Sequence, residues 1–222
     1  MFDEVSEIKD FLTLNFDNSE LYQNLKEKRI RDGNLPKISI SSLGTACDLC
    51  LYNHLREKAL DIQEQPEPNL YRTFDIGHSL EAMLIRYLEE IKKTSDVFFI
   101  SDQQKLYENE FLRGYIDCNL KFKDKEYITD IKTMNDVSFG YIQTYKKLPE
   151  RIKAQMHGYM YLSDTKKSLV LGINKNNSNL LVHVVEYDEE YADKLIKRAF
   201  NIHQSFLNND LTNIKRDIKC KC

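Results

Sequence analysis

The chain has 222 residues, of which 41% are hydrophobic and 30% charged, and its formal net charge is −3. With only seven glycines and four prolines, this composition predicts one ordered domain with a sizeable core and excludes a largely disordered chain. The slightly acidic balance also argues against a protein that binds nucleic acid through overall charge alone.

The first part of the chain is predicted to be mainly helical. Apolar residues recur at helical spacing from Phe2 to Leu25 and again from Ile76 to Ile91. In chain order we expect two helices within residues 2–31, an extended piece over 38–41, a helix that starts at a Ser41 or Ser42 cap and runs towards Leu60, a loop over 61–69, and a long helix over about 74–93.

From residue 97 the pattern changes to one typical of strands. We expect strands over 97–100, 103–107, 114–122 and 127–133, a helix over about 149–162, a strand pair over 168–174 and 180–187, and a closing helix over about 188–207. This order predicts an α/β fold with three layers, in which a central mixed sheet is flanked by helices. We expect a single domain over 1–222, made of a helical part (1–70), a core (71–187) and a C-terminal helix with a cysteine tail (188–222).

Two acidic residues and a lysine fall together in the predicted hairpin of strands 114–122 and 127–133. Asp130 and Lys132 are two apart on one strand, so their side chains share a face. If the hairpin turns at Lys123-Asp124, paired residue numbers add up to 247, and Asp117 lies opposite Asp130 at roughly 5 Å. Carboxylates this close repel each other, and a divalent cation such as Mg²⁺ or Mn²⁺ removes that cost.

Lys132 beside such a cation would help to orient or activate a water and offset the charge that builds on a phosphate. The carbonyl oxygen of Ile131 is a further possible ligand. The alternative interpretation is that Asp130 and Lys132 form an exposed pair on a solvated sheet face, because D-x-K is a short pattern.

The helices on either side of the hairpin carry two more polar pairs. His78 and Glu81 are three apart in the first turn of the long helix, and Gln155 and Tyr159 are four apart on the helix after the hairpin. Each pair therefore shares one helix face.

The order of helix, D…D-x-K hairpin and Q-x-x-x-Y helix resembles the RecB-like branch of the PD-(D/E)XK nucleases. That branch includes the CRISPR-associated RecB-like exonucleases and many phage recombination nucleases. The resemblance runs from about Ile38 to Tyr187 and implies a restriction-endonuclease-like fold, with the site at one sheet edge. It also implies that Asp117, Asp130 and the backbone of Ile131 hold the metal ion.

The same resemblance implies roles for the neighbouring residues. Lys132 is the catalytic lysine, and Gln155 and Tyr159 position the DNA and that lysine. The family's third metal ligand, His or Glu, follows a helix glycine by four residues, which points from Gly77 to Glu81. His78 follows the glycine by one residue, a departure that leaves its role open, and we favour Glu81 as the ligand.

The cysteines lie mainly at the two ends of the chain. Cys47 and Cys50 form a C-x-x-C, Cys220 and Cys222 close the chain, and Cys118 is predicted to be a core thiol. The branch resembled here often carries an iron–sulfur cluster that joins an N-terminal cysteine to C-terminal ones, so the four could bind [4Fe–4S] or Zn²⁺. That branch usually has one cysteine early and three late, whereas this chain has two and two. Thiols with no ligand role are the alternative.

The predicted activity is metal-dependent hydrolysis of DNA, most simply by an exonuclease that acts on single strands or duplex ends in recombination, repair or end-processing. One alternative is a structure-specific endonuclease. Another is a DNA-binding subunit that is active only within a larger complex. Protein partners and self-association cannot be read from the sequence.

The sequence carries no signal for membrane insertion or secretion. No apolar run approaches the roughly 20 residues that cross a bilayer. The acidic start, MFDEVSEIKDF, lacks the basic, apolar and small-residue regions of a signal peptide. We therefore expect a cytoplasmic protein, or one in the host cytoplasm if a phage encodes it, with no membrane partner.

Overall fold

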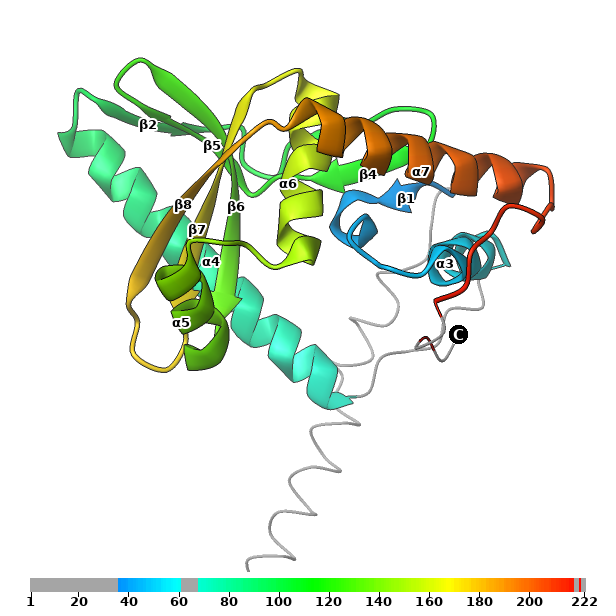
Figure 1. The fold of residues 1–222 in the computed structure, drawn as a ribbon. Helices are drawn as coiled ribbons and strands as arrows, with labels where there is room; N and C mark the ends of the chain where they lie inside the picture. The colour runs from blue at the N-terminus through cyan, green and yellow to red at the C-terminus, as the bar shows by residue number, and fades with distance from the viewer. Residues whose placement is uncertain (1–35, 61–67, 218–219, 221–222) are drawn as a thin grey trace, which may run out of the picture.

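The computed structural model describes residues 36–60, 68–217 and 220 (Figure 1). The helices predicted within residues 2–31, most of the predicted 61–69 loop, and Cys222 lie outside the described residues. The helical elements are η1 (Ile40–Ser42, a 3₁₀ turn), α3 (Asp48–Leu60), α4 (Pro68–Thr94), α5 (Asp136–Tyr145), α6 (Glu150–Ser163) and α7 (Glu189–Leu207). The strands are β1 (Ile38–Ser39), β2 (Phe98–Ser101), β3 (Leu106–Glu108), β4 (Leu112–Tyr115), β5 (Cys118–Phe122), β6 (Lys125–Met134), β7 (Lys167–Asn174) and β8 (Leu180–Glu186).

The strands form two sheets. The larger has the order β2-β5-β6-β7-β8, with β6 and β7 parallel and the other neighbours antiparallel. The smaller has the order β1-β4-β3, with β1 parallel to β4. β7 is buried along almost its whole length, as its continuous apolar run requires of a strand covered on both faces.

Helices cover both faces of the larger sheet (Figure 1): α4 crosses one face, and α5 and α6 lie on the other. On the α4 side, Leu84 shares a buried cluster with Ile131 of β6. On the opposite side, Met156 of α6 shares a second cluster with Ile128. The alternation of β6 residues between these clusters confirms the predicted three-layer α/β fold with a central mixed sheet.

The register of the β5–β6 hairpin is the one predicted. Cys118 pairs with Thr129 and Asn119 with Ile128, so each pair of numbers adds up to 247. The turn falls between β5 and β6 at Lys123, which adopts a left-handed backbone conformation with φ of 54°. The predicted helix over 149–162 and the closing helix over 188–207 are also confirmed, as α6 and α7.

The single strand predicted over 114–122 is wrong. The chain there forms β4 in the smaller sheet and β5 in the larger one, with Ile116 and Asp117 between them. Two contacts explain the break. The Ile116 N–H donates to the carbonyl of Lys105 at 3.1 Å instead of to a neighbouring strand of the larger sheet. A Cβ on Gly114 would lie 2.9 Å from the Cβ of Ile40, so β4 packs tightly against η1 only because residue 114 is glycine.

The helix predicted to start at Ser41 or Ser42 begins instead at Asp48. The guanidinium of Arg198 on α7 donates to the carbonyls of Leu43 and Thr45 and forms an ion pair with Asp48 at 2.6 Å. These carbonyls are therefore satisfied by a distant side chain, which holds the segment before α3 in an irregular conformation.

Two further helices differ from the sequence prediction, one in where it begins and one in being present at all. α4 begins at Pro68 rather than at about residue 74, and neither it nor any other helix in the described part is long and apolar enough to cross a bilayer. α5 was not predicted. Its cap is Asn135, whose side chain accepts the Ser138 N–H at 2.9 Å, and it is held by the buried Phe139 and Ile142.

Candidate active site

Asp117 lies where the chain passes from the smaller sheet to the larger one. Its carboxylate accepts the N–H of Ile131 at 2.5 Å, and its own carbonyl accepts the N–H of Gln104 at 3.2 Å. β5 stops pairing with β6 beyond Thr129, so the Asp117 side chain takes the place that a strand carbonyl would otherwise fill. The position of this carboxylate is thus fixed by the parting of the two sheets.

Asp130 and Lys132 lie on β6, and they share a face as predicted. β6 is the middle strand of the larger sheet, but its pairing with β5 ends at Thr129, so from Asp130 to Met134 it pairs with β7 alone among the described strands. The Asp130 side chain is almost fully buried, and its Oδ2 lies 2.7 Å from the ammonium of Lys132, which is 29% exposed. Lys132 therefore connects a buried carboxylate to the surface, and the exposed solvated pair considered from the sequence does not describe Asp130.

Gln155 and Tyr159 approach the same carboxylate from α6. The Gln155 side-chain amide donates to Asp130 Oδ1 at 2.8 Å. The Tyr159 hydroxyl donates to the backbone carbonyl of Tyr115 at 2.5 Å. Both side chains are buried. The Q-x-x-x-Y pair thus holds Asp130 directly and anchors the end of β4 just before Asp117.

The acidic groups destabilise one another when all are ionised. Burial raises the pKa of Asp117 to about 7, and the nearby charges of Asp130 and Glu81 act in the same direction, while the Ile131 N–H opposes them. Burial also raises the pKa of Asp130, against the opposing effect of Lys132. The site therefore holds more negative charge than its own lysine compensates.

Glu81 and His78 lie within α4 rather than in its first turn, because the helix begins ten residues before His78, at Pro68. Glu81 is half-buried, and His78 is exposed. Burial raises the pKa of Glu81, the charge of His78 lowers it and that of Asp130 raises it. The Glu81 carboxylate also accepts a hydrogen bond from the Gln104 side chain at 3.0 Å. Glu81 thus faces the β6 residues from the neighbouring helix.

This set of residues fits a divalent cation. The carboxylates of Glu81, Asp117 and Asp130 together carry three negative charges against the one positive charge of Lys132, which leaves the charge that one divalent ion would neutralise. Within residues 36–60, 68–217 and 220, the buried Asp130 Oδ2 has the Lys132 ammonium as its ion-pair partner and no other polar contact, so this oxygen keeps a lone pair for a ligand. The donors are all oxygens, as Mg²⁺ and Mn²⁺ prefer.

Two residues of the site were missed by the sequence analysis. Gln104 touches both Glu81 and Asp117, and Tyr115 presents the carbonyl that Tyr159 binds. Neither carries a sequence signal, because Gln104 lies in an exposed turn and Tyr115 takes part through its backbone.

Three of the predicted cysteine ligands lie together, at the start of α3 and near the end of the chain. The thiol sulfurs of Cys47, Cys50 and Cys220 all lie within 4.8 Å of one another, and those of Cys50 and Cys220 are 2.9 Å apart. In the described part of the chain, no other three ligand atoms of His, Cys, Asp or Glu are gathered as closely. The carboxylates of the site are therefore more widely spread than these thiols.

The tail reaches α3 because α7 packs along it. The ring of Tyr52 on α3 makes an edge contact with Phe206 at a centroid distance of 6.2 Å, and the N–H of Leu49 donates to the carbonyl of Lys215. Cys118 is fully buried between the sheet and α4, and burial raises its pKa to about 12, so it is the core thiol predicted.

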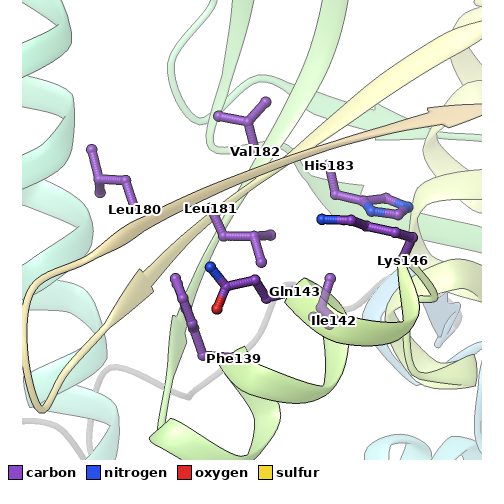
Figure 2. A pocket seen from close by; sticks show the side chains of 8 residues that line it. All are labelled: Phe139, Ile142, Gln143, Lys146, Leu180, Leu181, Val182 and His183. Atoms are coloured by element: carbon purple, nitrogen blue, oxygen red, sulfur yellow. The ribbon is translucent and has the colours of Figure 1, made fainter.

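A cavity of about 200 Å³ lies away from these residues, between α5 and β8. Figure 2 shows its lining, in which His183 of β8 and Lys146 at the end of α5 lie side by side above apolar side chains such as Phe139. None of its lining residues is a predicted site residue.

Comparison with known proteins identifies relatives by structure alone. No protein-family model matches the sequence, and no curated protein matches it. An alkaline exonuclease from Laribacter hongkongensis aligns with a TM-score of 0.62 and 13% identity, over 79% of this chain and 90% of that one. The same exonuclease in complex with dAMP gives a TM-score of 0.55 and 18% identity, over 79% and 88%. A phage-related exonuclease from Haemophilus somnus gives 0.57 and 17%, over 79% and 96%. At these identities the likeness shows that the chain has the fold of these exonucleases.

Proposed function

We propose that this chain is a metal-dependent deoxyribonuclease of the PD-(D/E)XK type, and that it acts as an exonuclease. The observation that carries the proposal is the buried Asp130, which contacts Lys132 and Gln155 and faces Asp117 where the two sheets part. An uncompensated acidic cluster beside a partly exposed lysine is the arrangement that hydrolysis of a phosphodiester needs.

The cation would be held by Asp117, Asp130 and the carbonyl of Ile131, with Glu81 as the ligand from α4. When bound, Mg²⁺ or Mn²⁺ supplies positive charge that stabilises the negative charge developing on the phosphate. Glu81 is preferred to His78 because it is half-buried and lies in the field of Asp130, whereas His78 is exposed.

The chain's own residues bind and orient the reactants. Asp130 holds the Lys132 ammonium at 2.7 Å, and from there Lys132 orients a water and offsets charge on the phosphate. Gln155 fixes the other oxygen of Asp130, so the carboxylate cannot rotate away from the lysine. Tyr159 holds the Tyr115 carbonyl and thereby the backbone that leads into Asp117.

The structural neighbours support DNA as the substrate. Both are described as exonucleases, and one was determined in complex with dAMP, a single nucleotide of the kind that exonucleolytic cleavage releases. This observation favours an exonuclease over the structure-specific endonuclease and over a DNA-binding subunit that is active only within a larger complex.

The test is an incubation of the purified protein with end-labelled linear and with circular DNA, single- and double-stranded, in Mg²⁺, Mn²⁺ or EDTA. We expect mononucleotide release from linear DNA, no cleavage of circles, and no reaction in EDTA. Asp130→Ala and Lys132→Ala should abolish release, whereas Lys121→Ala, which removes only an exposed partner of Glu126, should keep it. Full activity of either site variant would refute the assignment, and cleavage of circles would identify an endonuclease.

We also propose that Cys47, Cys50, Cys220 and Cys222 hold a structural [4Fe–4S] cluster or Zn²⁺. The close approach of three thiols from the two ends of the chain supports this. Thiolates are ligands for both, and a cluster would make anaerobically purified protein brown with absorbance near roughly 400 nm. Elemental analysis distinguishes iron from zinc. Purified protein that contains neither metal would refute the proposal and show that the thiols are not metal ligands.

A further inference from the structure

The turn between β2 and β3, residues 102–105, joins the acidic residues of α4 to the connection that carries Asp117. It leads from the larger sheet to the smaller one, and the connection at Ile116–Asp117 leads back. The two run side by side, because Gln104 N–H donates to the Asp117 carbonyl and Ile116 N–H to the Lys105 carbonyl.

Two glutamines of this turn reach α4. The Gln103 side chain donates to Glu89 at 2.6 Å, and the Gln104 side chain donates to Glu81 at 3.0 Å. The contacted glutamates are two helical turns apart on α4, and only Glu81 lies near the acidic site. The two glutamines are thus equivalent in chemistry but differ in what they hold.

The backbone of the turn shows that Gln104 is held in place. Gln104 has a φ of 54° and Asp102 a φ of 50°, values in the left-handed region that glycine adopts more easily. The carboxylate of Asp102 accepts hydrogen bonds from Asn119 on β5 at 2.8 Å and from Lys105 at 3.1 Å. The turn is therefore fastened to the larger sheet independently of its contact with α4.

Without a donor, the Glu81 carboxylate has a reason to turn away from the site. It is half-buried, and the charge of Asp130 opposes its ionisation. An unrestrained side chain on a helix surface would reduce this repulsion by rotating into solvent, and metal binding would then have to order it again. The Gln104 amide holds Oε1 in place, which leaves Oε2 for a ligand.

We propose that Gln104 is a positioning residue that joins two metal ligands, fixing Glu81 through its side chain and Asp117 through its backbone N–H. This inference rests on the proposed metal-dependent nuclease function. It assigns to the β2–β3 turn the task of setting the distance between the α4 ligand and the sheet ligands before a cation arrives.

The test is the affinity of the DNA-free protein for Mn²⁺, measured by titration calorimetry at about pH 8, above the pKa of about 7 of Asp117. Gln104→Ala should weaken Mn²⁺ binding about tenfold, the size typical of residues that orient a metal ligand. Gln103→Ala is the matched control. It removes an identical side chain from the same turn, but one that contacts Glu89 instead of Glu81, so Mn²⁺ affinity should change less than about twofold. Gln104→Gly should also weaken Mn²⁺ binding. The melting temperature of this variant should be equal to or above that of the wild type, because glycine adopts the left-handed backbone conformation of residue 104 more easily.

A double-mutant cycle shows whether Gln104 acts through Glu81. Adding Gln104→Ala to Glu81→Ala should cause no further loss of affinity, because the group that Gln104 holds has been removed. Wild-type affinity in Gln104→Ala, an equal loss in Gln103→Ala, or additive losses in the cycle would each overturn the inference while leaving the nuclease proposal intact. Wild-type protein that neither binds Mn²⁺ nor cleaves DNA would overturn both.

Discussion

Replacing Asp117 by asparagine should stabilise the metal-free protein, although it removes a proposed ligand. The amide side chain of the variant would keep an oxygen that accepts the Ile131 N–H, so the backbone contact is preserved. The substitution removes a charge that faces Asp130 and Lys132 on β6 and Glu81 on α4. A pKa raised from 3.8 to about 7 corresponds to about 4 kcal/mol at neutral pH.

Partial solvent access reduces this to an expected gain of about 2–4 kcal/mol, or about 5–15 °C in melting temperature for a chain of this length. The sign follows from the raised pKa. Ionised Asp117 destabilises the folded state, so the penalty is absent below about pH 4, grows between pH 4 and 7, and is constant above pH 7. The gain from Asp117→Asn should therefore be largest at about pH 8 and vanish near pH 4.

The assay is thermal unfolding in EDTA at about pH 4, 6 and 8, repeated at the highest pH with Mn²⁺. Mn²⁺ should raise the melting temperature of the wild type and raise that of Asp117→Asn much less. Asp102→Asn is the control. Hydrogen bonds from Lys105 and Asn119 lower the pKa of Asp102, so removing this carboxylate's charge should not stabilise the folded protein. A lower melting temperature for Asp117→Asn at high pH, or a gain that does not change with pH, would refute the electrostatic argument.

Four other predictions test the site and the fold. Glu81→Ala should need far more Mn²⁺ for DNA cleavage than His78→Ala, and the reverse order would make the histidine the ligand. If the thiols bind a metal, Cys47→Ser should lower the free energy of unfolding much more than Cys118→Ser in chemical unfolding. A link across the 170 residues from Cys50 to Cys220 is worth roughly 4–5 kcal/mol by analogy with a disulfide. Equal losses in the two variants would contradict a metal site. Gly44→Ala should destabilise the protein by about 1–3 kcal/mol, because the added Cβ would meet the backbone of Arg151. Gly140→Ala, with open space around residue 140 in α5, should stabilise it by about 0.5–1 kcal/mol. Calorimetric melting measures both changes, and two changes of the same sign would contradict the prediction. Arg198→Lys should lose about 1–3 kcal/mol in urea unfolding, because one ammonium cannot serve Asp48 and the carbonyls of Leu43 and Thr45 together, and an unchanged midpoint would show that these contacts do not hold the start of α3.

The sequence alone determined the features that follow from local periodicity. The turn at Lys123 and the alternation of β6 predicted a hairpin whose paired numbers add up to 247, with Asp130 and Lys132 on one face. The structure has this register as far as Cys118 and Thr129, and the predicted pair of Asp117 and Asp130 lies just beyond the end of the ladder. The apolar stripe of α7 and the strongly apolar run of β7 likewise predicted their own elements. Such patterns are readable because each residue's face is set by the residues within one or two turns of it.

Tertiary structure alone decided where the chain leaves one sheet for the other. Residues 114–122 alternate as one strand does, yet Gly114 packs against η1 and Ile116 bonds to the β2–β3 turn, so the strand ends before Asp117. Gln104 became part of the site for the same reason, because a turn residue has no periodicity that tells which helix its side chain will meet. The approach of Cys220 to Cys50 depends on α7 packing along α3. Each of these contacts joins residues far apart in the chain, and their pairing is set by the packing of whole elements, which no local pattern records.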